Sequence, residues 1–486
     1  MIRDLTRFME RFHRTPTTAA LPPVEGTVLG YSGLGSPVVM PYPTTERGSH
    51  VLILGATGAG KTQLAAHALA EEHRALRRRG VENALIVVDP KGDLAAALVA
   101  ELLVDETTTW DRVHVLDPFR EAFPLNLNLL PRGATPIEVW SVQLAELMGI
   151  ASTARGALQH LGVGSRQLDL AAHLVLAALT SQVDGASVLF ALDALQFADG
   201  FARLRAVTSS SRARDFLESL RIGEELRAST SSRLRNAFAA TESLERMIGA
   251  RTAIDLPGLV GPGQITCLDL GSPPGGMASL QSFFSTLLVR LVLDHLMTRT
   301  SPWTGHAVRL VIDEAHLVVP VLGDVLERVL TTGRSRGVSL VILTQGLSPI
   351  HRDAPELLPV LATNVPLKLA GRMSALDAER FAREQAPEPG TEESIAEVRR
   401  RFLTQISGLP DRTFVALTPS GRVRFTATTV DVEQRARARD GSGDLLFRLR
   451  QRHALLDEGE RVKLPATPPP RRPPRTRPPG GGSRFG

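Results

Sequence analysis

The segment HVLILGATGAGKTQ, residues 50–63, constrains the fold of this chain more than any other. An apolar run of strand length leads into a glycine-rich loop, and a helical pattern follows the loop. Residues 55–62 have the spacing G-x-x-x-x-G-K-[ST], in which glycines let backbone N–H groups turn toward phosphate oxygens at a helix N-terminus. A glycine-rich turn that precedes a helix by chance is the alternative. The complete strand–loop–helix context favours a phosphate-binding loop.

The residues of this loop have expected roles in binding ATP and Mg²⁺. Lys61 should reach the β- and γ-phosphates, and the hydroxyl of Thr62 should bind the metal. Lysine occurs four times in the whole chain, so a lysine within a motif is more informative than usual. The predicted nucleotide contacts are Gly55, Ala56, Thr57, Gly58, Ala59, Gly60, Lys61, Thr62 and Gln63.

Apolar runs alternate with helical patterns on both sides of a long helical stretch, which predicts an α/β fold with a mostly parallel sheet. The stretch 134–253 has helical periodicity and few β-branched runs, so we expect an all-α insertion. Residues 412–430 should form a closing hairpin that turns between Pro419 and Gly421. The expected strands are 50–54, 84–89, 112–117, 264–271, 308–316, 338–345 and 365–371.

These patterns predict a division of the chain into domains. A core domain is interrupted by the helical insertion and is followed by a helix and a disordered tail. The predicted boundaries are 1–49 for an N-terminal helix and approach segment, 50–133 and 254–430 for the core, 134–253 for the insertion, 431–464 for the C-terminal helix and 465–486 for the tail.

The positive charge of the chain belongs to its tail. There are 56 basic and 51 acidic residues, and removing the five arginines of 465–486 leaves 51 of each sign. The proline-rich tail is interpreted as an extended polyproline-type arm. Docking on DNA or an acidic partner and a merely solubilising role both remain open for it.

The composition favours a cytoplasmic protein. No apolar run reaches the roughly 20 residues that span a bilayer, and the N-terminus lacks the apolar core of a secretory signal. The single Cys267 excludes a disulfide framework and fits a reducing compartment.

Two expected strands end in aspartate, Asp89 in LIVVDPKGD and Asp313 in LVIDEAH. ATP hydrolysis needs a carboxylate for Mg²⁺ and a second group that acts on the attacking water. Asp313 and Glu314 supply both, so Asp313 is predicted to bind the metal and Glu314 to act on the water. An acidic strand end that caps the next helix is the alternative. For 89–93, a capping turn and a functional element are equally open.

The segment GRSRGVSLVILTQ, residues 333–345, places two arginines before a strand that ends in a glutamine. The carboxyl ends of parallel strands line one edge of a sheet, so Gln345 should sense the γ-phosphate or orient the water. Arg334 is interpreted as a residue that acts on the nucleotide of a neighbouring subunit. Capping of a helix before Gly337 is the alternative for both arginines, and it is preferred for Arg336.

These motifs together resemble the HerA/FtsK superfamily of ring-shaped DNA-pumping ATPases, and within it the TraG/TraD-like coupling proteins of conjugation and type IV secretion. The resemblance covers about residues 26–430. It is carried by SHVLILGATGAGKT (49–62), VVDPKGD (87–93), LVIDEAH (310–316), GRSRGVSLVILTQ (333–345) and TNVPLKLAGRMSALDAERFA (363–382). In that family an arginine eleven residues before the glutamine acts on the neighbouring subunit's ATP, and Arg334 has that position here.

The resemblance implies a RecA-like P-loop core, a homohexameric ring and DNA that threads a central channel during ATP hydrolysis. The expected partners are DNA, of either strand type, and a secretion, relaxase or nuclease protein. Coupling proteins usually carry N-terminal membrane helices and HerA proteins a small β-barrel; this sequence shows neither, which leaves the subfamily open. Two other functions also remain open: a protein-substrate ATPase of a secretion or pilus machine, peripheral at a membrane, and a HerA-like ATPase that gates a partner nuclease in phage defence.

Overall fold

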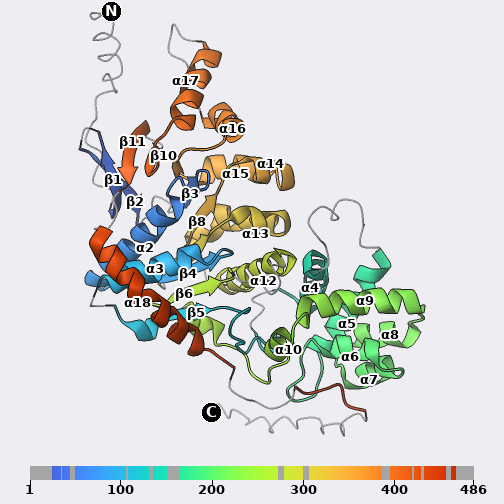
Figure 1. The fold of residues 1–486 in the computed structure, drawn as a ribbon. Helices are drawn as coiled ribbons and strands as arrows, with labels where there is room; N and C mark the ends of the chain where they lie inside the picture. The colour runs from blue at the N-terminus through green and yellow to red at the C-terminus, as the bar shows by residue number, and fades with distance from the viewer. Residues whose placement is uncertain are drawn as a thin grey trace, which may run out of the picture. The chain divides into compact units, whose positions relative to one another are not determined.

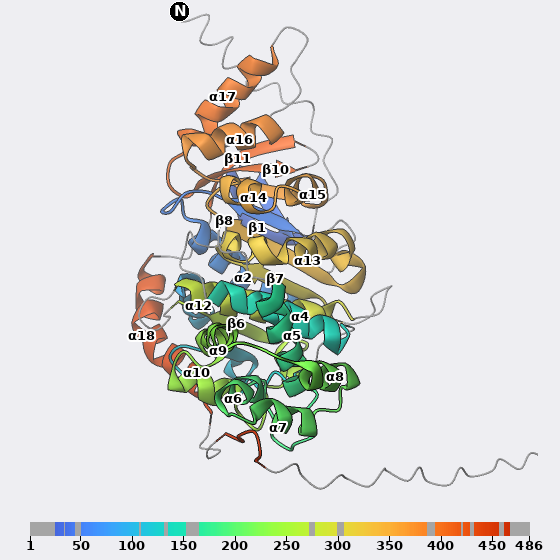
Figure 2. The same ribbon diagram turned by 90° about the vertical axis from the view of Figure 1, so that its right-hand side faces the viewer.

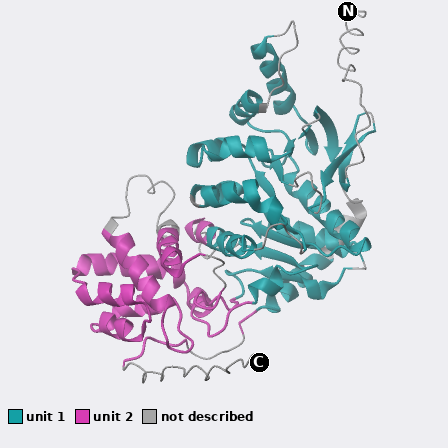
Figure 3. Cartoon of the chain, turned by 180° about the vertical axis from the view of Figure 1, so that it is seen from behind, with its two compact units in different colours: residues 1–121, 255–276, 284–453 teal, residues 122–254, 277–283, 454–486 magenta. Residues whose placement is uncertain are grey.

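The structure, a computed structural model, divides into two compact units, which Figure 3 shows in different colours. Unit 1 comprises residues 1–121, 255–276 and 284–453, and unit 2 comprises 122–254, 277–283 and 454–486. The described residues are 25–33, 35–43, 50–105, 108–130, 135–151, 165–271, 278–298, 306–385, 394–418, 421–427, 432–455 and 461–466.

The described strands of unit 1 form one sheet in the order β2-β1-β11-β10-β9-β3-β8-β7-β4-β6-β5 (Figure 1). The seven strands from β9 to β5 are parallel to their neighbours, and the remaining pairs are antiparallel. The mostly parallel sheet and the closing hairpin β10–β11 are therefore confirmed. The bounds are β1 (Gly26–Ser32), β2 (Pro37–Pro41), β3 (Val51–Leu54), β4 (Ala84–Asp89), β5 (Val113–Leu116), β6 (Ile265–Asp269), β7 (Val308–Ile312), β8 (Val338–Thr344), β9 (Leu367–Ala370), β10 (Thr413–Thr418) and β11 (Gly421–Ala427).

The central strands are buried along their whole length because helices cover both faces of the sheet. Helices α2, α3 and α18 lie on one face (Figure 1), and α13 to α15 lie on the other (Figure 2). The bounds are α2 (Lys61–Arg78), α3 (Asp93–Leu103), α11 (Leu256–Leu259), α12 (Ala278–Leu296), α13 (Val319–Thr332), α14 (Ser348–Asp353), α15 (Leu357–Asn364), α16 (Ala375–Gln385), α17 (Ile395–Ser407) and α18 (Val432–Gln451). Three short 3₁₀ helices are η1 (Trp110–Arg112), η3 (Ala315–Leu317) and η4 (Gly333–Arg336).

Unit 2 is helical, as its periodicity predicts, and it includes a segment from the end of the chain. Arg461 forms ion pairs with Asp193 (2.8 Å) and Glu245 (2.7 Å), and the N–H of Leu464 donates to Asp193 (2.9 Å). These bonds attach 461–464 to the helices of the unit. The bounds are α4 (Ile137–Ala151), α5 (Ser165–Leu179), α6 (Phe190–Gln196), α7 (Gly200–Val207), α8 (Ser211–Ser219), α9 (Glu224–Phe238) and α10 (Glu242–Ile248). Across the described parts of both units, no helix has the length and apolar character that a membrane span requires.

Strands β1 and β2 correct the expectation of an approach segment without strands before residue 50. A Cβ on Gly26 would lie 2.1 Å from the carbonyl oxygen of Met40, and one on Gly30 would lie 2.1 Å from that of Thr426. These glycines made the segment resemble a loop in the sequence, but they are required because neighbouring strands approach the backbone closely. The helix expected within 1–49 and the tail from residue 467 lie outside the described residues.

His50, which is 3% exposed and directly precedes β3, should make stability depend on pH. Its Nδ1 accepts a hydrogen bond from the N–H of Leu340 in β8 (3.0 Å). Burial, followed by the charges of Arg309 and Arg334, lowers the pKa of His50 from 6.5 to about 4. Between these values the unfolded chain binds more protons than the folded chain, so stability should fall as pH decreases from 6.5 to 4. The loss is about 3 kcal/mol for this group.

His50→Asn keeps an acceptor for the Leu340 amide but removes the titrating ring. The variant should lose less stability than the wild-type protein when denaturant unfolding is compared at pH 7.5 and pH 5. An equal loss in both proteins would contradict the assignment of this pH dependence to His50.

Candidate functional site

The carboxyl ends of β3, β8, β7 and β4 meet at one edge of the sheet because these strands are parallel neighbours. A cavity of about 450 Å³ opens there. The loop after β3 and the start of α2 form one side of it, with Thr57, Gly58, Gly60, Lys61, Thr62 and Gln63. The other lining residues are Lys91, Asp93, Asp313, Glu314, Asp411 and Arg412.

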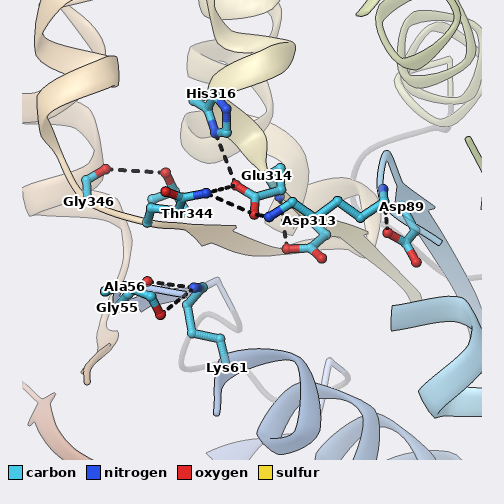
Figure 4. Close-up of polar contacts among 11 residues, drawn as sticks. Gly55, Ala56, Lys61, Asp89, Asp313, Glu314, His316, Thr344 and Gly346 are labelled. Carbon is cyan, nitrogen blue, oxygen red and sulfur yellow. Dashed lines mark hydrogen bonds and ion pairs between the residues drawn. The ribbon is translucent and has the colours of Figure 1, made fainter. Parts of the chain in front are cut away.

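The glycine-rich loop has the backbone that its sequence predicts. Gly58 (φ 84°) and Gly60 (φ 94°) adopt left-handed conformations, which glycine tolerates without a Cβ clash. The Nζ of Lys61 donates to the carbonyl oxygens of Gly55 (2.5 Å) and Ala56 (3.2 Å), as Figure 4 shows. Burial lowers the pKa of Lys61, and the carboxylates across the cavity oppose this effect.

Asp313 follows β7 directly and is 3% exposed. Its Oδ1 accepts a hydrogen bond from the N–H of Glu314 (2.9 Å). Burial, reinforced by the charge of Glu314, raises the pKa of Asp313 to about 6. A buried carboxyl group of this kind gains stability as an anion when a cation lies beside it.

The donors in this cavity fit Mg²⁺. Thr62 and Asp313 both line the cavity and carry a hydroxyl and a carboxylate, and oxygen is the ligand atom that this ion prefers. Within the described ranges, no three His, Cys, Asp or Glu side chains converge to hold a metal. Mg²⁺ commonly takes one or two protein carboxylates and completes its shell with water and phosphate oxygens.

Glu314 is held by three side chains. The Nε2 of Gln345 donates to both of its carboxylate oxygens (3.3 Å each), and the Nζ of Lys91 forms an ion pair with Oε1. The Nδ1 of His316 lies 3.2 Å from Oε2 (Figure 4). Burial by itself raises the pKa of Glu314, but the contacts with His316, Lys91 and Gln345 outweigh it and lower the pKa to about 2. Glu314 is therefore ionised and oriented at neutral pH.

Both interpretations of the DPKGD segment apply, each to a different residue: Asp89 caps a helix, and Lys91 belongs to the site. The carboxylate of Asp89 accepts the backbone N–H groups of Lys91 (3.0 Å) and Ala95 (2.8 Å), so it caps the start of α3. Burial raises the pKa of Asp89 to about 7 against the hydrogen bond from Ala95. The side chain of Lys91 instead reaches Glu314. The sequence analysis did not assign Lys91 to the site, although the rarity of lysine was a signal for it.

Gln345 and Arg334 lie near opposite ends of β8. Gln345 follows its carboxyl end and contacts Glu314, and a bond from the hydroxyl of Thr344 to the carbonyl of Gly346 (3.2 Å) spans it (Figure 4). Arg334 is exposed in η4 before the amino end. Seven strand residues separate the two edges by roughly 20 Å. Arg334 therefore does not reach the cavity of its own subunit, and its role on a neighbouring subunit stays a prediction.

Arg336 lies in η4, and its side chain contacts the end of α12 rather than the helix before Gly337 that the preferred alternative names. Its Nη1 donates to the carbonyl oxygen of Met297, directly after α12 (2.6 Å).

Asp93, the first residue of α3, also lines the cavity and was not assigned to the site. Asp411 and Arg412 are the remaining lining residues that sequence reasoning missed. They lie in the turn between α17 and β10, which matches no motif.

Comparison with known proteins finds a similarity for the region that contains the glycine-rich loop. A sequence-family model described as the central domain of the helicase HerA matches residues 47–272. This part of the chain is similar to a HerA central domain. It contains the glycine-rich loop and Lys91, whereas Asp313, Glu314 and Gln345 lie beyond the matched residues. No curated protein matches the chain.

Solved structures extend the likeness beyond the matched region. VirB4 of Thermoanaerobacter pseudethanolicus has a TM-score of 0.59 at 15% identity, covering 85% of this chain and 99% of that one. The plasmid coupling protein TrwB in complex with ADP and Mg²⁺ has a TM-score of 0.50 at 16% identity, covering 84% and 91%. At these identities the likeness shows the fold alone, and it confirms the predicted RecA-like P-loop core.

Proposed function

We propose that the protein binds and hydrolyses ATP in this cavity. The observation that carries the proposal is the position of the Asp313–Glu314 pair, which faces the glycine-rich loop across the cavity. A phosphate-binding loop alone would fit a binding module. A buried acidic pair and Gln345 beside it are the groups that hydrolysis requires.

The residues have distinct proposed roles. The loop N–H groups and Lys61 bind the phosphates, and Thr62 and Asp313 hold Mg²⁺, which neutralises charge on the phosphate oxygens. Glu314 positions the attacking water. With a pKa of about 2 it is a weak proton acceptor, so its main contribution is orientation rather than proton abstraction. Lys91 and Gln345 hold its carboxylate in place.

Substitutions at Glu314, Lys61 and Lys91 should separate chemistry from binding. Glu314→Gln should lower kcat at least 100-fold and keep nucleotide affinity, because it removes the charge that orients water. Lys61→Ala should weaken both. Lys91→Met should lower kcat about tenfold with little change in KM, because it frees one oxygen of Glu314. Phosphate release and fluorescent-nucleotide binding measure these effects.

The exposed Glu379→Gln in α16 is the matched control and should behave as the wild-type protein. Unchanged turnover in Glu314→Gln would remove the proposed role of the acidic pair. A loss of affinity in Lys91→Met equal to the loss of kcat would show that Lys91 binds nucleotide rather than positioning Glu314.

We further propose that the protein works as a homohexameric ring in the cytoplasm. The position of Arg334, exposed at the edge of the sheet remote from its own cavity, supports shared sites. Arg334→Ala subunits keep Glu314, and Glu314→Gln subunits keep Arg334. Each variant alone should have low turnover, and a mixture should recover part of it, because a site with an intact Glu314 receives Arg334 from its neighbour. A mixture no more active than its components would exclude this arrangement.

DNA is the proposed substrate of the motor, on the basis of the match to the HerA helicase domain and the likeness in fold to TrwB, a coupling protein by name. ATP turnover should rise when DNA is added, and the rise should fade between 50 and about 200 mM salt as phosphate contacts weaken. Phosphate release with single- and double-stranded DNA at several salt concentrations measures this. Stimulation by a polypeptide instead would favour a secretion ATPase, and stimulation by neither would favour an ATPase that gates a partner enzyme.

A further inference from the structure

The turn between α17 and β10 forms a further wall of the cavity, and this wall carries an arginine. Strand β10 is antiparallel to β9, so its amino end lies at the same edge as the carboxyl ends of the parallel strands. Arg412 directly precedes β10 and lines the cavity beside Gly60. In the sheet order, β10 and β9 lie on one side of β3, and β8, β7 and β4 lie on the other. Arg412 and Glu314 therefore approach the loop from opposite sides.

The backbone of Arg412 is held in an unusual conformation. Its φ is 62°, and among the described residues only Glu314 shares a positive φ without being glycine. The N–H of Arg412 donates to the carbonyl oxygen of Ala59 in the loop (3.1 Å), and its own carbonyl accepts the N–H of Ala427 (2.9 Å). Strained residues that the surroundings hold in place are concentrated at ligand sites. Both strained residues here line the same cavity.

The side chain of Arg412 packs against the loop at Gly60, and its positive charge is not paired with any acidic side chain that the structure describes. A Cβ built on Gly60 would lie 3.3 Å from Cγ of Arg412, so the two residues are in close contact. The neighbouring acid, Asp411, is paired with Arg372 (2.9 Å). Across the described part of the chain, the guanidinium of Arg412 has no hydrogen-bond or ion-pair partner. A forked cation in this position suits oxygens of a phosphate group.

We propose that Arg412 binds the α- and β-phosphates of the nucleotide that its own subunit holds. This rests on the proposed ATPase function. The residues that act on the γ-phosphate and water approach from the β7 and β8 side, so Arg412 contacts the part that ADP and ATP share. It is a binding residue, and it lies at the cavity because β10 runs antiparallel to β9.

Arg412→Gly is the informative variant, because glycine removes the side chain and relieves the positive φ without threatening the fold. Affinities for ADP, a non-hydrolysable ATP analogue and inorganic pyrophosphate, measured calorimetrically, should each fall about tenfold or more and by similar factors. At saturating ATP, kcat should stay within about threefold of the wild-type value. Arg412→Lys should recover part of the affinity, and the exposed Arg424→Ala in β11 should change none of these values.

Three results would overturn the inference. These are unchanged affinity for ADP and pyrophosphate, a loss confined to the ATP analogue, and a fall in kcat without a fall in affinity. If the wild-type protein itself binds neither ADP nor the ATP analogue, the proposed ATPase function fails. If the wild-type protein binds both and Arg412→Gly binds them equally well, only the role of Arg412 fails.

Discussion

Parallel pairing of β3 with β8, and of β7 with β8 and β4, is the constraint on which the site depends. These neighbouring strands run in the same direction. The residues that follow them therefore meet at one edge of the sheet, although they are far apart in the sequence. The residues that line the cavity in this way include Lys61, Lys91 and Glu314, and Gln345 contacts the carboxylate of Glu314. The continuous Val, Ile and Leu runs that allow burial on both faces therefore also assemble the chemistry.

The adjacent carboxyl groups of Asp313 and Glu314 lie at the same edge of the sheet but have different pKa values. Asp313 is buried, and its pKa is raised to about 6; Glu314 is contacted by three side chains, and its pKa is lowered to about 2. The difference follows from their surroundings, because burial and the charge of Glu314 dominate at Asp313, whereas His316, Lys91 and Gln345 contact Glu314. Asp313, whose ionised form gains from a nearby cation, suits a metal ligand. Glu314, which is already ionised, suits a residue that orients water.

Much of the fold could be predicted from the sequence because its signals are local. Apolar runs mark the parallel strands, and the spacing of Gly55, Gly60 and Lys61 marks the loop. Strands β1 and β2 could not be found in this way, because the glycines of β1 serve contacts with distant strands. Arg412 was missed because its place depends on the antiparallel turn at β10. Lys91 was missed because the rarity of lysine marks the residue but does not show that its side chain reaches Glu314. The domain boundaries remain proposals.

The two ends of β8 give the proposed ring a physical link between neighbouring sites. Gln345 touches Glu314 at the carboxyl end, and η4 carries Arg334 at the amino end. The strand between them is buried and paired on both sides, so we expect it to move as one rigid element. If Arg334 acts on the neighbouring nucleotide, a shift of Gln345 when the γ-phosphate leaves would move Arg334 relative to that neighbour. Hydrolysis in one subunit would then alter the next through a single strand, without a separate signalling element.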